Sequence, residues 1–371
     1  MKHPRAPRTG LLMLPLLTAA TLAQADTLNL KWTELRRSTI TASDAAMEVV
    51  AINDNGQAAG RTWRTSKVYN STTRSWIDST VYTATRWSAA GLPTTLASSG
   101  QAVVNDLGAD GTVVGADQGS AVVWKATTAT TLGAPAGSKA QSVNAQAINA
   151  SGQIVGTISA DNALGTMKQR HAATWTSQGM TDLHGSLPVP SINTESMAVG
   201  IGADGTIGVH LLSDALGSST GTTCYILKDG TVTSLKQSGA IACQIGTMAR
   251  DGSALTQQIS IRPCTPEERL SGLCYPQTYA SAWWHQGTLT PVAYGLQLLR
   301  SGLLFKVDTS GVSRVNGDGS STPMQFNVTG LPTGFSATKF VDSNAKGQYL
   351  VQLTRDSGSV RLVRWGVLSP R

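Results

Sequence analysis

Apolar and polar residues alternate along this chain in short segments, and a turn that contains glycine precedes many of these segments. Segments such as 112–114 and 153–155 follow a glycine and alternate or are β-branched, which is typical of short strands. An Asn or Asp commonly precedes the glycine, as in 53–56, and favours a tight hairpin because glycine tolerates positive φ. Glutamate is rare, so the Glu–Lys pairs that support long helices are missing. The pattern predicts an all-β chain.

This pattern repeats along the chain. Each repeat has a turn glycine and, further on, a segment that ends at an aromatic or large apolar residue. The turn glycines are Gly56, Gly111, Gly152, Gly205, Gly252, Gly311 and Gly347. The aligned large residues are Trp87, Trp124, Trp175, Leu227, Trp283, Phe326 and Trp365. The mean spacing is about 46 residues, within the range of propeller blades.

Each repeat offers three or four short strands, and such a sheet must stack on neighbours to bury its faces. The sequence therefore predicts a β-propeller of seven blades. The last repeat is short, because only 366–371 follow Trp365. The alternating segment 27–32 is expected to supply its missing strand from the N-terminal side.

The first residues have the three parts of a secretory signal peptide. Lys2, Arg5 and Arg8 form a basic start, an apolar run follows at 11–17, and Ala23-Gln24-Ala25 is a small-x-small cleavage site. The apolar run is too short to cross a membrane. We expect a signal peptide at 1–25, a single domain at 26–371, no membrane span, and a periplasmic or extracellular protein.

Removal of the signal peptide changes the charge of the chain. The formal net charge of the whole sequence is +7, and three of these charges lie in the signal peptide. The remaining charge of about +4 is too small to predict a nucleic-acid partner. We expect a monomer whose partner is a protein or a polysaccharide.

One repeat, 147–183, resembles the bacterial extracellular repeat called HAF. That pattern combines an Ile-Asn-x-x-Gly turn, an apolar pair with Gly, His-Ala-Phe-x-Trp, Gly and Asp-Leu. The matching residues are Ile148, Asn149, Gly152, Ile154, Val155, Gly156, His171, Ala172, Trp175, Gly179, Asp182 and Leu183, with Ala173 in place of Phe. The resemblance implies an exported repeat protein of propeller type and implies no activity.

Four cysteines in an exported chain predict two disulfides. The favoured pairing is sequential, Cys224 with Cys243 and Cys264 with Cys274, because it closes the shortest loops; the other two connectivities stay open. A zinc site is not indicated, since the chain has no Cys-x-x-Cys and no clustered histidines.

The sequence predicts no catalytic residues, no metal site and no cofactor. Most acids occur about once per turn, so Asp54, Asp110, Asp204 and Asp251 are interpreted as turn formers. Calcium remains a possible cofactor for the loop 106–111, although the full calcium-loop pattern is missing. His171 is interpreted as structural, because other polar residues replace it in the other repeats.

The first repeat is enlarged: 31 residues separate Gly56 from Trp87, against 13 between Gly111 and Trp124. Its residues 61–87 mix basic and aromatic side chains, which suits polysaccharides, acidic glycans or other anionic surfaces. The candidate binding residues are Trp63, Arg64, Arg74 and Trp76. The favoured alternative is a hairpin whose alternating faces bury the aromatics and expose the basic residues.

Two classes of function follow. The first, which we favour, is an exported binding or scaffold module for a protein or a glycan, because loops on a rigid frame carry recognition. The second is an exported hydrolase or lyase that acts on a polysaccharide at the propeller channel. Inward-facing acids or histidines with perturbed pKa values would favour the enzyme, and a channel of small, apolar residues would favour the module.

Overall fold

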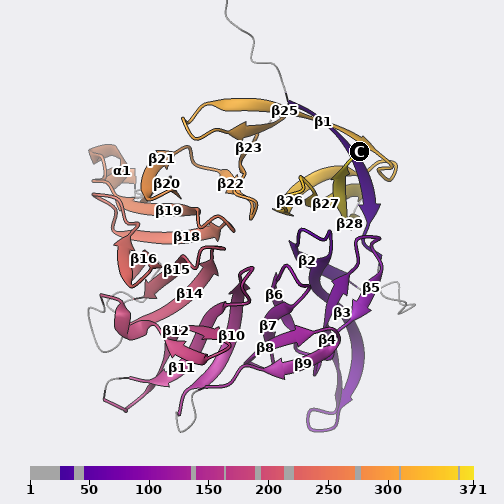
Figure 1. Cartoon of the computed structure of the whole chain (residues 1–371), viewed down its shortest axis with the longest axis horizontal. Coiled ribbons are helices and arrows are strands. Elements are labelled where there is room, and N and C mark those ends of the chain that lie inside the picture. Colours follow the sequence, from indigo (N-terminus) through magenta and orange to yellow (C-terminus); the bar gives the residue numbers. More distant parts are fainter. Residues whose placement is uncertain are drawn as a thin grey trace, which may run out of the picture.

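The structure is a computed structural model, and it describes residues 26–36, 46–134, 139–162, 164–188, 194–212, 221–271, 277–308, 311–357 and 360–371. The predicted signal peptide lies outside these residues. The described chain is a β-propeller: its sheets radiate around a centre, and the innermost strand of each sheet faces that centre (Figure 1).

Five sheets contain four consecutive strands each, and we call them units 1 to 5. Unit 1 comprises β2 (Ala46–Ile52), β3 (Ala58–Asn70), β4 (Ser75–Trp87) and β5 (Pro93–Thr95). Unit 2 comprises β6 (Val103–Leu107), β7 (Val113–Asp117), β8 (Ser120–Lys125) and β9 (Thr128–Thr131). Unit 3 comprises β10 (Gln141–Ile148), β11 (Ile154–Asp161), β12 (Lys168–Thr176) and β13 (Gly179–Asp182). Unit 4 comprises β14 (Glu195–Ile201), β15 (Ile207–Leu212), β16 (Thr222–Lys228) and β17 (Thr231–Ser234). Unit 5 comprises β18 (Ala242–Met248), β19 (Ala254–Ile261), β20 (Gln277–His285) and β21 (Thr288–Val292).

A sixth sheet has eight strands and contains two further four-stranded units. Unit 6 comprises β22 (Leu296–Leu298), β23 (Leu304–Asp308), β24 (Gly311–Val315) and β25 (Ser321–Thr329). Unit 7 comprises β26 (Ser336–Ser343), β27 (Tyr349–Ser357), β28 (Val360–Pro370) and β1 (Asp26–Glu34). The described helices are the short η1 (His184–Ser186) and α1 (Pro266–Ser271). Neither is long and apolar enough to cross a membrane.

The predicted closure by the N-terminal strand is confirmed. β1 pairs antiparallel with β28, from Leu30↔Pro370 to Glu34↔Gly366, and so completes unit 7. It also pairs in parallel with β25 of unit 6, which joins the two units into one sheet and was not expected. Leu30 and Trp32 of β1 are buried, so the added strand contributes to the core as well as to the sheet.

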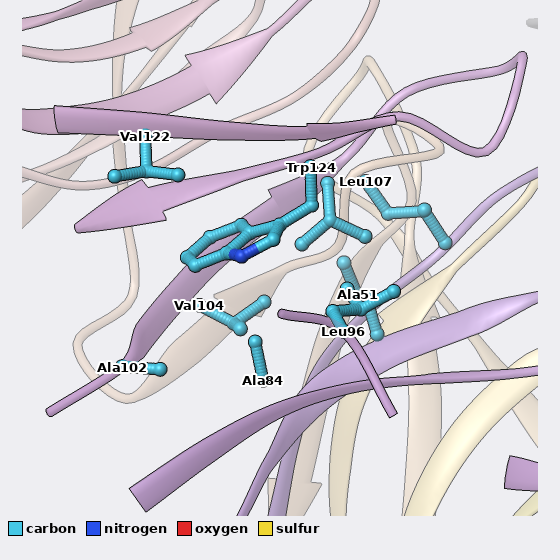
Figure 2. Packing of buried hydrophobic residues seen from close by; sticks show 10 residues of the cluster. Ala51, Ala84, Leu96, Ala102, Val104, Leu107, Val122 and Trp124 are labelled. Carbon is cyan, nitrogen blue, oxygen red and sulfur yellow. The ribbon is translucent and has the colours of Figure 1, made fainter. Parts of the chain in front are cut away.

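The core consists of clusters between neighbouring units. Figure 2 shows one of them, where Trp124 of unit 2 packs on Ala51, Ala84 and Leu96 of unit 1. The small alanines leave room for the fully buried indole. In units 1 to 4 one large residue from the third strand therefore packs against the preceding unit.

The predicted position of this large residue is correct in units 1 to 4 and wrong in units 5 to 7. It pairs with the first residue of the second strand, as Trp87 pairs with Ala58. In units 5, 6 and 7 the equivalent pairs place Trp284, Val315 and Leu368 there, in place of Trp283, Phe326 and Trp365. In units 5 and 7 the physical reason is strand alternation, because a shift of one or three residues sends the side chain to the other face of the sheet. In unit 6 the predicted Phe326 lies on the fourth strand, β25, and not on the third.

The predicted turn of unit 6 is also wrong. The turn between the first two strands of unit 6 contains Gly302, whose N–H bonds to the carbonyl of Leu299, whereas Gly311 begins the third strand. Both glycines have positive φ, 87° and 128°. Positive φ and a preceding Ser are compatible with either turn, so the local sequence does not separate them.

Candidate functional site

The strands β3 and β4 form a hairpin that extends far beyond its sheet; we call residues 58–87 the extended hairpin (Figure 1). The inner neighbour β2 reaches only to Trp63, and the outer neighbour β5 pairs only with 85–87. Among the described residues, the ribbon beyond the Trp63–Tyr82 pair therefore has no strand paired with its β3 edge. Such a two-stranded ribbon exposes both of its faces to solvent.

One face of the extended hairpin carries four aromatic rings. Directly paired residues share a face of the ribbon, so Trp63 with Tyr82 and Tyr69 with Trp76 lie on the same side. The ring centroids are 5.9 Å apart in the first pair and 5.6 Å apart, edge to face, in the second. We call these four residues the aromatic ladder.

Polar pairs lie between the two aromatic pairs of the ladder. The hydroxyl groups of Thr65 and Thr80 are 2.9 Å apart, and Lys67 Nζ lies 2.8 Å from Asp78 Oδ1. Trp76 is 66% exposed and Tyr69 is 52% exposed. The ladder is therefore an open surface on which flat apolar rings alternate with hydrogen-bonding groups.

The hypothesis that the hairpin buries its aromatics is wrong for this outer part. Trp63, next to the sheet, is partly buried, but Tyr69 and Trp76 face solvent because no other element covers them. The opposite face is also open, with Val68, Ile77 and Val81 at 46%, 44% and 48% exposure.

Most of the basic residues of the extended hairpin have protein partners. Arg61 lies 2.9 Å from Glu48, Lys67 pairs with Asp78, and Arg86 Nη1 donates to the carbonyl of Gly111 at 2.8 Å. By contrast, the side chains of Arg64 and Arg74 make no ion pair or hydrogen bond within the part of the chain that the structure describes.

The structure brings only part of the predicted set together. Trp63 and Trp76 share the aromatic face, Arg64 points to the opposite face by strand alternation, and Arg74 lies in the turn with a φ of 50°. Strand alternation therefore divides the four residues among two faces and the tip, and their role in binding stays a prediction.

The second candidate site is the central channel. Six of the innermost strands carry a β-bulge at the same position. The bulged residue is the third from the end of each strand. The bulged residues are Val50, Asn105, Gln146, Val199, Gly246 and Val341. Bulges turn a side chain out of the regular alternation, and five of these residues line a central cavity of about 240 Å³.

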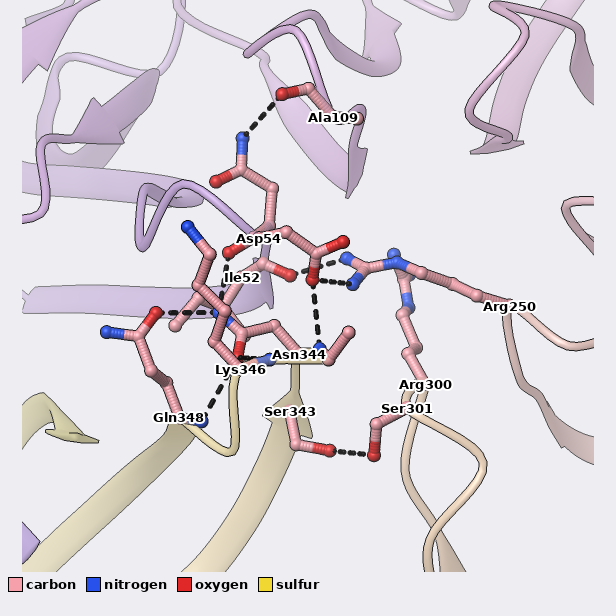
Figure 3. A network of polar contacts seen from close by, with 12 residues as sticks. Ile52, Asp54, Ala109, Arg250, Arg300, Ser301, Ser343, Asn344, Lys346 and Gln348 are labelled. Atoms are coloured by element: carbon pink, nitrogen blue, oxygen red, sulfur yellow. Dashed lines mark hydrogen bonds and ion pairs between the residues drawn. The ribbon is translucent and has the colours of Figure 1, made fainter. Parts of the chain in front are cut away.

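The turns after the innermost strands form a closed ring of hydrogen bonds, which we call the turn ring. In order around the propeller, the contacts join Asn53 to Gly108 O (3.0 Å), Ile148 N to Asp106 (2.9 Å), Asn149 to Gly202 O (3.3 Å), Ala203 N to Arg250 O (2.6 Å), Arg250 N to Arg300 O (2.8 Å), Ser301 to Ser343 (2.5 Å) and Asn344 to Asn53 O (2.8 Å). Each unit is therefore tied to the next at this end of the channel, and Figure 3 shows the part around Asn344 and Ser343.

Two arginines cross the channel from the turns of units 5 and 6. Arg300 of unit 6 pairs with Asp106 of unit 2, and its Nη2 donates to the carbonyl of Asn105 at 3.1 Å. Arg250 of unit 5 donates to the carbonyl of Ile52 at 2.5 Å and lies 3.6 Å from Asp54 (Figure 3). We call this pair the arginine bridge, since it joins opposite sides of the ring.

The channel acids are engaged by the protein. Asp106 accepts the backbone N–H of Ile148, and Asp342 accepts that of Ile52 at 2.8 Å. Burial raises the pKa of Asp342, although Arg300 and Arg250 act in the opposite direction. These carboxyls are structural acceptors, and the rest of the cavity wall is mostly small or apolar.

A third polar cluster surrounds His171, the histidine of the HAF-like motif. Its Nδ1 lies 2.7 Å from Asp182 Oδ2, and its ring stacks on His184 at 4.0 Å. His184 Nδ1 lies 2.8 Å from the hydroxyl oxygen of Ser196, and burial lowers the pKa of His184. Ser196 is fully buried and accepts the N–H of Ala172, so no substrate can reach it. The cluster ties unit 3 to unit 4, as the structural interpretation of His171 expects.

Three of the four loop acids and the described cysteines agree with their predicted structural roles. The prediction is wrong for Asp54, which accepts the N–H of Ala345 in unit 7, while Asn53 accepts the N–H groups of this turn. Asp110, Asp204 and Asp251 each accept the backbone N–H two residues later. Cys224 and Cys243 form a disulfide between units 4 and 5, with a Cα–Cα distance of 5.4 Å. Cys264 is disulfide-bonded as well, and Cys274 lies outside the described residues. Among the described residues no group of His, Cys, Asp and Glu could hold a metal ion, and the calcium hypothesis stays a prediction.

Comparisons with known proteins find likeness only at the level of structure. No family model and no curated protein matches the chain, so the HAF resemblance stays a prediction. The chain is similar to the β-propeller domain of the Trilobed protease from Pyrococcus furiosus, with 9% identity, a TM-score of 0.46, and coverage of 87% of this chain and 94% of that one. It is also similar to the acylaminoacyl peptidase of Pyrococcus horikoshii, with 12% identity, a TM-score of 0.44, and coverage of 90% of this chain and 53% of that one. At these values the likeness carries no argument about activity.

Proposed function

We propose that this protein is an exported binding module that holds an acidic polysaccharide on the extended hairpin. The observation that carries the proposal is the aromatic ladder, with Tyr69 and Trp76 packed against each other and open to solvent. A large aromatic surface without a cover on a soluble chain marks an interaction site.

The chemistry of the ladder favours a sugar polymer. Exposed ring faces can stack on the C–H faces of sugars, while Thr65, Thr80 and the Lys67–Asp78 pair offer hydrogen bonds between the rings. Six residues separate Trp63 from Tyr69, which corresponds to about 20 Å along the strand. An extended ligand of several sugar units would be needed to contact both aromatic pairs.

The charge of the hairpin favours an acidic polymer over a neutral one. The partners Glu48 and Asp78 neutralise Arg61 and Lys67, whereas Arg74 at the tip remains available to a ligand on the ladder. Arg64, on the opposite face, adds only long-range positive charge. Unpaired guanidinium groups attract carboxylates and sulfates by long-range electrostatics and by bidentate hydrogen bonds.

Export is part of the proposal. It is supported by the signal-like sequence at 1–25 and by the disulfide between Cys224 and Cys243, since disulfides persist in oxidising compartments. The alternative, a polysaccharide hydrolase or lyase at the channel, has less support, because Asp106 and Asp342 are engaged with backbone N–H groups.

The test is affinity electrophoresis of the mature protein in gels that contain polygalacturonate or, as a neutral polymer of similar length, dextran. We expect retardation by polygalacturonate that weakens as salt is added. Trp76→Ala should weaken this binding about tenfold, and the double change Arg64→Ala/Arg74→Ala should remove most of its salt dependence.

The matched control is Lys125→Ala, which removes an exposed lysine of unit 2 outside the hairpin. It should leave the retardation unchanged. If the hairpin variants bind polygalacturonate as well as the wild type, or if the wild type binds neither polymer, the proposal is wrong. Circular dichroism of each variant separates loss of binding from loss of folding.

A further inference from the structure

Four tryptophans occupy the same position in their units, and one of them differs from the rest. Trp87, Trp124 and Trp175 are buried against the preceding unit. Their indole N–H groups donate to the carbonyls of Arg36 (2.7 Å), Ala97 (2.6 Å) and Gly133 (3.0 Å), respectively. Trp284 occupies this position in unit 5.

Trp284 is only partly buried, and its indole N–H has no hydrogen-bond partner among the residues that the structure describes. It lines a groove of about 700 Å³ between units 4 and 5. Ile226 of unit 4, behind it, is almost fully buried. The position that closes the boundary elsewhere is therefore the wall of an open groove here.

Polar groups surround this indole. Lys228 and Asp229 at the end of β16, Thr231 and Thr233 on β17, and Gln286 in the turn after β20 line the groove. Thr231 and Thr233 are two residues apart on one strand, so both hydroxyl groups lie on the same face of the sheet. One aromatic wall together with hydroxyl, amide and carboxylate groups matches the apolar face and the hydroxyl rim of a sugar ring.

The charge of the groove disfavours anionic ligands. Three carboxylates, those of Asp204, Asp229 and Asp251, line it together with one ammonium group, that of Lys228. Lys228 Nζ lies 2.5 Å from Asp204, so that cation is already neutralised. The groove is thus net negative, the reverse of the extended hairpin.

We propose that the groove at Trp284 is a second ligand site, which takes a neutral saccharide of about disaccharide size. In this site the indole of Trp284 stacks on the sugar ring and its N–H donates to a ring or hydroxyl oxygen, while Thr231, Thr233 and Asp229 hydrogen-bond the hydroxyl groups. The site does not rest on the extended hairpin, because it lies on other units and has the opposite charge.

The experiment is isothermal titration calorimetry of the mature protein with maltose, cellobiose and lactose, and with digalacturonate as the anionic probe. We expect at least one neutral disaccharide to bind with a Kd of about 1 mM or tighter, and digalacturonate not to bind in this groove. Trp284→Leu should weaken binding at least tenfold. Leucine is a replacement that the fold already uses, since Leu227 holds this position in unit 4.

A second variant protects the test against misfolding of Trp284→Leu. The double variant Thr231→Val/Thr233→Val keeps the shape of the strand and should weaken the binding of the same disaccharide several-fold. Trp76→Ala on the extended hairpin should not change the binding of this disaccharide. Failure of the groove proposal is therefore distinguishable from failure of the hairpin proposal. Absence of saturable binding by all three neutral disaccharides at about 10 mM, or equal binding by both groove variants, would overturn the proposal.

Discussion

The turn ring and the extended hairpin are both built from antiparallel strands and tight turns, yet they treat their polar groups in opposite ways. At the turn ring, Asp106 and Asp342 are buried and each accepts a backbone N–H from the next unit. On the hairpin, Arg64, Arg74 and Trp76 extend into solvent with no charged or hydrogen-bonding partner among the described residues. Polar groups that are fully engaged hold a fold together, whereas groups left open on a rigid frame are available to a ligand.

The largest effect should come from breaking the arginine bridge. Arg300→Met leaves the carboxylate of Asp106, whose side chain is 6% exposed, without its cation. We expect the free energy of unfolding in urea to fall by about 4 kcal/mol. The matched hairpin change is Lys67→Met, which breaks an exposed pair and should cost less than about 1 kcal/mol.

A double variant, Arg300→Met/Asp106→Asn, sharpens this prediction. It removes the unpaired charge and should recover part of the lost stability. Equal losses for Arg300→Met and Lys67→Met would show that the channel pair is no more important to the fold than a surface pair.

Lowering the pH should reduce the stability of the packed interior before it affects the extended hairpin. Burial lowers the pKa of His210 to about 4, and its Nε2 accepts the N–H of Ile245 at 2.7 Å. The unfolded chain has a His pKa near 6.5, so between pH 6.5 and 4 it binds a proton that the folded protein does not. Stability therefore falls as pH falls, by about 3 kcal/mol at pH 4.

The measurement is urea unfolding at pH 7 and pH 4 for the wild type and for His210→Gln. The variant lacks the titrating group, so the difference between the two proteins isolates His210 from the other acids and histidines. An identical pH dependence in both proteins contradicts the prediction.

The smallest effect on stability should come from the ladder itself. Trp76→Ala removes a side chain that is 66% exposed, so the thermal unfolding midpoint should hardly move and the free energy of unfolding should change by less than about 0.5 kcal/mol. A loss above about 1 kcal/mol would show that the aromatic ladder supports the fold and would remove the contrast with the turn ring.

The sequence predicts the sheets well because their turns are encoded locally. Asn or Asp before Gly specifies most of the tight turns, and alternation in 27–32 is enough to predict the closing strand. Trp283 and Trp284 are adjacent, and only the pairing of Trp284 with Ala254 decides which one faces the preceding unit. Unit 6 has Ser before its turn glycine and a second candidate glycine nearby, so the local sequence alone predicts the turn at the wrong glycine.

The arginine bridge was missed although a signal for it exists in the repeat. Arg250 and Arg300 hold the same turn position in units 5 and 6, and Asp106 and Asp342 hold the same strand position in units 2 and 7. Aligning the charged residues position by position would reveal this separation of charge. Which arginine reaches which acid depends on the width of the channel, and that is a property of the closed ring.

The pairing of β1 with β28 and β25 also sets the order of events during synthesis. Residues 26–34 are synthesised long before their partners at 324–329 and 366–370. Contacts of such long sequence separation form late, because the loop between them must close first. A growing chain therefore cannot complete unit 7 before residues 366–370 have been made, and the ring stays open until then.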